Sequence, residues 1–230
     1  MTAPMIESEW LGSADPQAML RHLGCKAGDR KRRLFACACC RRAWHLLVDP
    51  RIRTAVETAE RYADKGATET ELENASDCAE VVYRSRNQTP AGHAAAHAVV
   101  STTAGSLDLS HTALLAAQAI VNPRNIAEPS ESERASFDVE YAAQTSVLRD
   151  LVGNPFRPVT VDASWIRWHD GAVPKLAQIM YDGRVFDRMA TLAAALEGAG
   201  CSQSDILEHC RSGSEHVRGC WVVDLMLGKG

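Results

Sequence analysis

The stretch 29–48 (DRKRRLFACACCRRAWHLLV) constrains the fold of this chain more than any other segment. On a helix with about 3.6 residues per turn, its apolar side chains cover more than half of the circumference and its basic side chains occupy the remaining sector. Such a helix belongs in a hydrophobic core and presents one narrow basic stripe. We therefore predict a buried helix over 29–48 and place Arg41, Arg42 and His45 in its basic stripe.

The stripe belongs to a strongly basic segment. Residues 30–53 contain eight Lys or Arg against one acid, a local charge of +7, although the whole chain has a net charge of -4. The following segment, 57–80, contains eight acids against two basic residues, a local charge of -6. We expect the two segments to neutralise each other through intramolecular ion pairs. The first alternative is that Arg41, Arg42 and His45 bind another protein, and the second is that they bind nucleic acid.

Composition indicates an ordinary globular protein. With 230 residues, 46% of them hydrophobic and 23% charged, the chain suffices for one domain or two small lobes. It has neither a secretory signal nor an apolar stretch of about 18 residues, so we expect no membrane contact. Its eight cysteines include the adjacent pair Cys39 and Cys40, which argues against a set of disulfides. We expect a soluble, cytoplasmic protein with reduced thiols.

Helix signals recur along the rest of the chain as capping residues, first-turn prolines and closing glycines. They predict helices over 7–11, 16–23, 51–64, 68–87, 131–152, 171–181, 184–197, 203–211 and 219–227, and two more inside 89–121. The segment 219–227 is apolar enough to be a strand, but we favour a helix there because every earlier element is helical. Residues 122–130 contain two prolines and predict a loop.

Residues 153–171 (GNPFRPVTVDASWIRWHDG) have a different character, with two prolines and alternating valines. This pattern predicts an extended connector rather than a helix. The predicted fold is therefore all-α. A bundle-like N-terminal lobe spans 1–152, and the tryptophan-containing connector leads into a smaller helical C-terminal lobe, so that 153–230 is the second part of one compact unit.

The chain resembles a known protein family in eight segments. They are EWL (9–11), DRKRRLFACACCRRAWHLL (29–47), AVETAERYADKGAT (55–68), GNPFRPV (153–159), WHDG (168–171), KLAQIMYD (175–182), FDRMATLAAALEGAGC (186–201) and HVRGCWVVDLMLGK (216–229). Together they resemble a family of planctomycete proteins that occurs in many copies per genome. The resemblance covers somewhat over half of the chain and leaves out the alanine-rich middle. It implies a bacterial cytoplasmic protein, and the family has no assigned activity, cofactor or structure to transfer.

Two groups in the N-terminal half have metal-ligand spacing. Cys37 and Cys40 form a C-x-x-C motif on one side of the 29–48 helix, but in the middle of an apolar helix burial raises the thiol pKa, so we interpret them as core cysteines. His93 and His97 lie one helical turn apart, and His111 follows on the next predicted helix. No acid is present there to orient the imidazole rings, so the pattern only weakly indicates a metal.

The C-terminal third contains a second set of nitrogen and sulfur groups: His209, Cys210, His216 and Cys220, with Cys201 upstream. Imidazole and thiolate are the usual ligands of zinc, but structural zinc motifs show paired cysteine or histidine knuckles, and no two cysteines here are so spaced. The set is a candidate zinc site, and zinc is the single cofactor we consider. The alternative is that these are buried thiols and histidines near helix ends.

Arg157, Trp165, Trp168, His169 and Asp170 gather a guanidinium, two indoles, an imidazole and a carboxylate in the connector. Such a mixture is typical of a small-molecule cleft. The alternative is that the tryptophans anchor the connector to a core and that Asp170 is the N-cap of the next helix.

No phosphate-binding glycine loop, nucleophile elbow or H-E-x-x-H motif is present in the sequence. The leading hypothesis is therefore a non-catalytic helical module for protein interaction or regulation. The alternative is a metal-binding or small-molecule enzyme that uses either the connector or the C-terminal Cys/His group. Whether the chain is an enzyme is left open, with the non-catalytic interpretation favoured.

Overall fold

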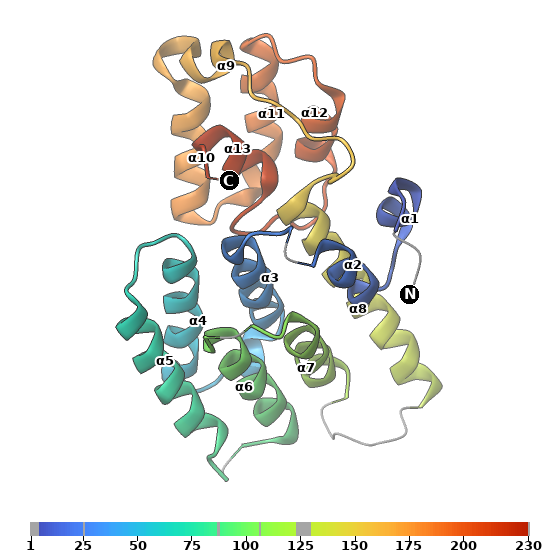
Figure 1. The fold of residues 1–230 in the computed structure, drawn as a ribbon, viewed down its shortest axis with the longest axis vertical. Helices are drawn as coiled ribbons and strands as arrows, with labels where there is room; N and C mark the ends of the chain where they lie inside the picture. The colour runs from blue at the N-terminus through green and yellow to red at the C-terminus, as the bar shows by residue number, and fades with distance from the viewer. Residues whose placement is uncertain (1–4, 25, 87, 106, 123–129, 230) are drawn as a thin grey trace. The chain divides into compact units, whose positions relative to one another are not determined.

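The computed structural model describes residues 5–24, 26–86, 88–105, 107–122 and 130–229 (Figure 1). Throughout these ranges the regular elements are helices, and no strand is present. The all-α prediction is confirmed. Within the same residues, no helix combines the length and the apolar character needed to cross a membrane.

The chain divides into two compact units, Met1–Leu148 and Arg149–Gly230. The predicted boundary followed residue 152, whereas the observed one lies inside helix α8 (Glu131–Val152). The last turn of α8 therefore belongs to the second unit. That the two units form one compact body stays a prediction.

The N-terminal unit is built around α3, which packs against α4, α6 and α7 (Figure 1). Its helices are α1 (Glu7–Gly12), α2 (Pro16–Leu23), α3 (Asp29–Arg42), the 3-10 turn η1 (Trp44–Leu46), α4 (Pro50–Ala63), α5 (Glu69–Tyr83), α6 (Pro90–Thr103), α7 (Leu109–Val121) and most of α8. Each residue from Leu34 to Cys40 is no more than 6% exposed, so α3 is the core helix that its sequence predicts. The predicted loop 122–130 lies almost wholly outside the described residues.

The core helix is shorter than predicted, because α3 ends at Arg42 and not at residue 48. After Ala43 the chain tightens into η1, and Asp49 then caps α4 with its side chain while Pro50 fills the first helical position. The Arg53 guanidinium donates to the carbonyl oxygens of Trp44 and Leu47 and so ties α4 to η1. The Asp49–Pro50 start signal of α4 is also present in the sequence, but the apolar helical pattern before it predicts that the preceding helix continues to residue 48.

The C-terminal unit has its own hydrophobic core, which includes Tyr181, Leu192 and Leu196, all fully buried. Its helices are α9 (Ala163–Arg167), η2 (Trp168–Asp170), α10 (Ala172–Gly183), η3 (Phe186–Arg188), α11 (Met189–Gly198), α12 (Ser204–Arg211) and α13 (Trp221–Leu227). The strand alternative for the last segment is thereby excluded.

The connector is less extended than predicted. Asp162 caps α9 by accepting a hydrogen bond from the Ser164 amide at 2.8 Å, so helical structure begins about midway through the segment. Asp170 is not the N-cap of α10, although the alternative interpretation of the connector gave it that role. Its backbone is left-handed, with φ at 56°, and Gly171 occupies the N-cap position with φ at 81° and no side-chain cap. Glycine adopts this conformation without steric cost.

Candidate metal centre

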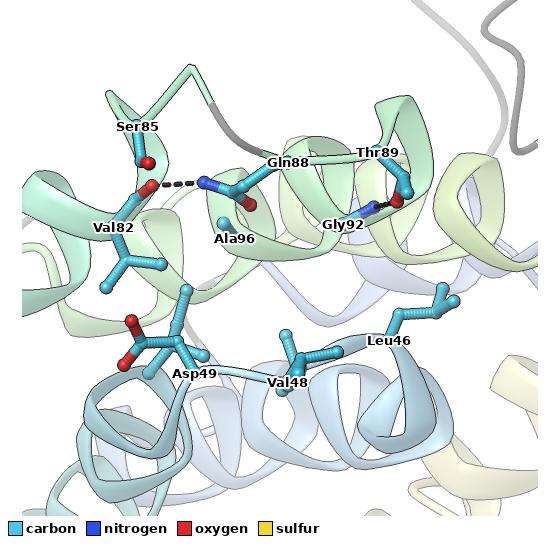
Figure 2. A pocket seen from close by; sticks show the side chains of 11 residues that line it. Leu46, Val48, Asp49, Val82, Ser85, Gln88, Thr89, Gly92 and Ala96 are labelled. Carbon is cyan, nitrogen blue, oxygen red and sulfur yellow. Dashed lines mark hydrogen bonds between the residues drawn. The ribbon is translucent and has the colours of Figure 1, made fainter.

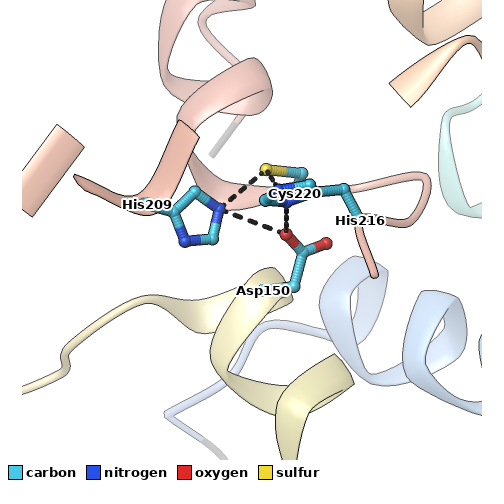
Figure 3. A group of neighbouring side chains, drawn as sticks. All are labelled: Asp150, His209, His216 and Cys220. Carbon is cyan, nitrogen blue, oxygen red and sulfur yellow. Dashed lines mark hydrogen bonds and ion pairs between the residues drawn. The ribbon is translucent and has the colours of Figure 1, made fainter. Parts of the chain in front are cut away.

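Four potential metal ligands converge in the C-terminal unit (Figure 3). Asp150 comes from the last turn of α8, His209 from α12, His216 from the loop after it, and Cys220 from the N-cap of α13. One ligand atom from each side chain lies within 4.8 Å of all the others. In the part of the chain that the structure describes, no other group of three or more such side chains meets this condition.

The distances within this group suit a small cation. Asp150 Oδ1 lies 2.6 Å from His216 Nδ1 and 3.1 Å from His209 Nε2. Cys220 Sγ lies 3.2 Å from His209 Nε2 and 4.0 Å from His216 Nδ1. Bonds of about 2.0–2.3 Å to a tetrahedral zinc ion hold its ligand atoms roughly 3.3–3.6 Å apart. The observed separations lie on both sides of that range, so small side-chain movements would complete the coordination.

Electrostatics within the cluster favour a cation. Burial alone would raise the pKa of Asp150, but hydrogen bonds from His209 and His216 outweigh it and hold that pKa below its ordinary value. Burial, together with the charge of Asp150, raises the pKa of the Cys220 thiol well above its ordinary value. The site therefore contains a carboxylate and, without a cation, a protonated thiol. A divalent ion would reverse the second effect by stabilising the thiolate.

Surrounding groups position the ligands. The Val217 amide donates to Asp150 Oδ2 at 2.8 Å, which leaves Oδ1 facing the two imidazoles. The Trp221 ring packs beside His209 with a centroid separation of 5.2 Å. Hydrogen bonds and packing of this kind around metal ligands fix their orientation and raise affinity.

The structure brings together three members of the predicted zinc set, His209, His216 and Cys220. Cys210 is not among them, because it lies in the hydrophobic core with Cys201 nearby. Neighbouring residues on a helix point about 100° apart, so His209 and Cys210 cannot face the same site. Sequence reasoning missed Asp150. Its signal is the acid between apolar pairs in VLRDLV (147–152), since a carboxylate at a buried helical position needs a partner.

The connector residues do not gather as a cleft lining. Trp165 is 5% exposed and belongs to the core, and Trp168 packs directly on Gly198. His169, Asp170 and Arg157 are exposed, and His169 packs edge-on against the neighbouring Trp168 with a centroid separation of 4.2 Å. The tryptophans thus anchor the connector, which was the alternative interpretation.

The basic stripe of α3 pairs with buried acids. Arg41 makes two hydrogen bonds to Glu60 at 2.7 and 2.8 Å, as expected from the acidic segment. Arg42 binds Glu140 on α8 in the same way, at 2.9 and 2.8 Å, so its partner lies outside the segment we expected. His45 is exposed on η1 and is not part of the α3 surface.

The prediction that Cys37 and Cys40 are buried is confirmed, since each is 1% exposed. Burial raises the pKa of Cys40 to about 12. A hydrogen bond with Thr102 at 3.3 Å lowers this pKa, but by less than burial raises it. The pKa of Cys37 is also raised, first by burial. These thiols are small apolar groups at neutral pH.

Tyr83 and three histidines, His93, His97 and His111, form one aromatic group. Tyr83 stacks on His97 at 4.7 Å and lies 4.5 Å from His93, while His111 meets His97 edge-on at 5.0 Å. Burial, followed by the neighbouring His111 and His93, lowers the pKa of His97 below its ordinary value of 6.5. The four rings pack against one another where α5, α6 and α7 meet.

A lowered histidine pKa makes stability depend on pH. In the unfolded chain His97 protonates as the pH falls through 6.5, whereas in the folded protein it resists protonation. Stability is therefore complete above pH 6.5 and declines below it. We expect His97→Gln to flatten the decline of urea midpoints between neutral pH and pH 5, whereas His45→Gln, at an exposed histidine, should leave it unchanged. Equal slopes in the wild type and His97→Gln would contradict this account of the cluster.

A cavity of about 400 Å³ lies between the 46–52 segment, the end of α5 and the start of α6 (Figure 2). Its lining is largely apolar and includes Leu46, Val48 and Val82. The Gln88 amide spans its upper side and donates to the Val82 carbonyl. The one charged lining residue, Asp49, already caps α4 and pairs with Arg51. We assign no ligand to this cavity, because no charge in its lining selects one.

Comparisons with family models, with characterised proteins and with solved structures find no match to this chain. The resemblance to the planctomycete family stays a prediction. Function must therefore be argued from the geometry of the sites.

Proposed function

We propose that the C-terminal unit binds one zinc ion through Asp150, His209, His216 and Cys220, and that the protein is a metal-stabilised, non-catalytic helical module. The observation that carries this proposal is the convergence of four ligand atoms of the right kinds within 4.8 Å. Three of the ligands lie in a short stretch of chain, and Asp150 joins them from another helix.

The donor set favours zinc. Calcium and magnesium bind oxygen ligands, and this set offers a single carboxylate. Two imidazoles and one thiolate suit zinc, which accepts nitrogen, sulfur and oxygen in tetrahedral geometry without redox chemistry. The nearly complete burial of Asp150 and Cys220, 2% and 0% exposed, is typical of an enclosed site.

Four protein ligands fill a tetrahedral coordination sphere and leave no position for a substrate, which supports a structural role. The ion would link the end of α8, α12 and the start of α13. We further propose a cytoplasmic location and a role in protein interaction or regulation. Support comes from the seven described cysteines, all of them free, and from the missing catalytic motifs.

Elemental analysis of the purified protein tests the metal site. We expect one zinc ion per chain that survives dialysis, because structural zinc sites contribute about 10 kcal/mol or more of apparent binding free energy near neutral pH. Cys220→Ser and Asp150→Asn should each lower the zinc content sharply. Cys210→Ala, next to a ligand but directed into the core, should retain zinc although it loses stability, and His169→Asn, at an exposed histidine, should retain it fully.

Two results would overturn the proposal. A metal-free protein that also fails to bind added zinc in a competition with a chromogenic chelator would remove the site. Equal zinc content in Cys220→Ser and the wild type would place the ion elsewhere. Cobalt substitution separates a structural site from a catalytic one, because a five-coordinate spectrum that responds to added anions would show an open position and favour the enzyme alternative.

A further inference from the structure

A second cavity, of about 570 Å³, lies in the N-terminal unit and has four basic side chains in its lining. Its lining includes Arg30, Arg32 and Arg33 from the first turn and a half of α3, and Lys65 just after α4. Asp29 is the one acid among the described residues of that lining. Tyr62, Ala63, Ala67 and Leu107 supply the apolar part.

Two of these four basic side chains, Arg33 and Lys65, form no ion pair with the described residues. Arg30 pairs with Asp64 at 2.9 Å. Arg33 is 7% exposed and donates to the carbonyl oxygens of Thr102 and Ala104, and no carboxylate among the described residues lies within ion-pairing distance of it. Lys65 is exposed, and it also forms no ion pair with any described residue.

Arg32 is held only loosely by its acid. Its guanidinium meets Asp29 at 3.3 Å, but the Asp29 side chain is 95% exposed, and such surface pairs contribute little. The Nε of Arg32 is buried and has no hydrogen-bond partner among the described residues. A buried donor without a partner carries a desolvation cost that a ligand oxygen would remove.

Counting the paired Asp64 as well as Asp29, four basic side chains face two acids around the cavity. We infer that this cavity binds a small organic phosphate, with the dianionic phosphate group between Arg32, Arg33 and Lys65. The α3 N-terminus adds to the positive potential, since Gly28 supplies no side-chain cap there.

The size of the cavity indicates an organic phosphate and not the inorganic ion alone. Pockets for small organic molecules measure roughly 300–1,000 Å³, a range that includes this one. The Tyr62 ring lies under the Arg33 guanidinium, 5.1 Å from ring centroid to Cζ, and with Ala63 and Leu107 it offers an apolar wall. This wall is where the organic part of the ligand would lie.

Calorimetric titration of the full chain at low ionic strength tests this inference, with phenyl phosphate, inorganic phosphate, benzoate and phenol as probes. We expect phenyl phosphate to bind most tightly, inorganic phosphate and benzoate at least about fivefold more weakly, and phenol not at all. Arg32→Gln and Lys65→Gln should each weaken phenyl phosphate about tenfold, as expected for the loss of a charge-assisted hydrogen bond. Arg86→Gln removes an exposed charge beyond the end of α5 and should have no effect.

Asp29→Asn provides an opposite test, because removing the competing acid should strengthen phenyl phosphate binding several-fold. A merely destabilised fold would not produce this gain. Arg33 is unsuitable for substitution, since its buried hydrogen bonds also hold the end of α6.

Several outcomes would overturn the inference. They are the absence of saturable binding of phenyl phosphate, equal affinity in Lys65→Gln and the wild type, and benzoate binding as tightly as phenyl phosphate, which would indicate a carboxylate ligand. Lys65-dependent binding of a DNA oligonucleotide with no response to phenyl phosphate would assign the surface to nucleic acid instead. The zinc site lies in the other unit, so each proposal is tested independently of the other.

Discussion

Arg42→Ala should lower the free energy of unfolding of the N-terminal unit by about 3–5 kcal/mol, which makes it one of the most damaging substitutions in the protein. The reason is the acid that it leaves behind. Glu140 is 5% exposed, and both of its carboxylate oxygens accept from Arg42. Without the guanidinium, the hydrogen bond from Gln144 at 3.3 Å is the one side-chain hydrogen bond that the described residues still offer the buried charge.

Urea unfolding followed by circular dichroism measures this loss, and it should persist in high salt because buried pairs are weakly screened. Arg84→Ala breaks an exposed pair with Glu80, 74% and 31% exposed, and should cost no more than about 0.5 kcal/mol. The double variant Arg42→Met with Glu140→Leu should recover most of the stability, since it removes both charges. A small effect of Arg42→Ala, together with loss of binding to a partner, would show that the stripe is an interaction surface.

Gly153→Ala should destabilise the C-terminal unit by about 2–5 kcal/mol, because it combines two separate costs. The backbone of Gly153 is left-handed, with φ at 71°, where a side chain is strained. A Cβ atom there would also lie 3.1 Å from the ring of Trp221, which packs beside His209 of the proposed zinc site.

Two other glycines separate these costs. Gly213 has φ at 63° and open space around it, so Gly213→Ala measures backbone strain alone, about 1–2 kcal/mol. Gly198 has ordinary backbone angles, but its Cβ would lie 2.9 Å from Trp168, so Gly198→Ala measures crowding alone. Thermal unfolding of the three variants should place Gly153→Ala near the sum of the other two. A loss no larger than that of Gly213→Ala would mean that Trp221 moves aside without cost.

Local signals in the sequence predicted local structure well. Asp15, Asp49 and Thr68 cap the helices that follow them, because a cap depends on residues two or three positions away. The end of α3 was missed because two local signals compete over 43–50, where an apolar helical pattern meets the Asp49 cap and Pro50. The pattern alone does not show which of them prevails.

Long-range partners were the part that sequence reasoning could not supply. Arg42 and Glu140 are separated by 98 residues, and nothing near either of them indicates the other. The metal cluster likewise combines ligands that are close in sequence with one that is distant. The sequence identifies the three ligands within one stretch as candidates, but choosing His209 over Cys210 depends on how α12 is rotated, and recognising Asp150 depends on where α8 ends. Both are properties of packing between helices.

The buried cysteines give the protein internal reporters of its own opening. Cys37, Cys39 and Cys40 lie in the core of the N-terminal unit, Cys201 and Cys210 in that of the other, while Cys78 is exposed. An alkylating reagent reaches a buried thiol only when the structure around it opens. Labelling rates read site by site therefore measure how often each unit opens, with Cys78 as the unprotected reference and no engineered label required.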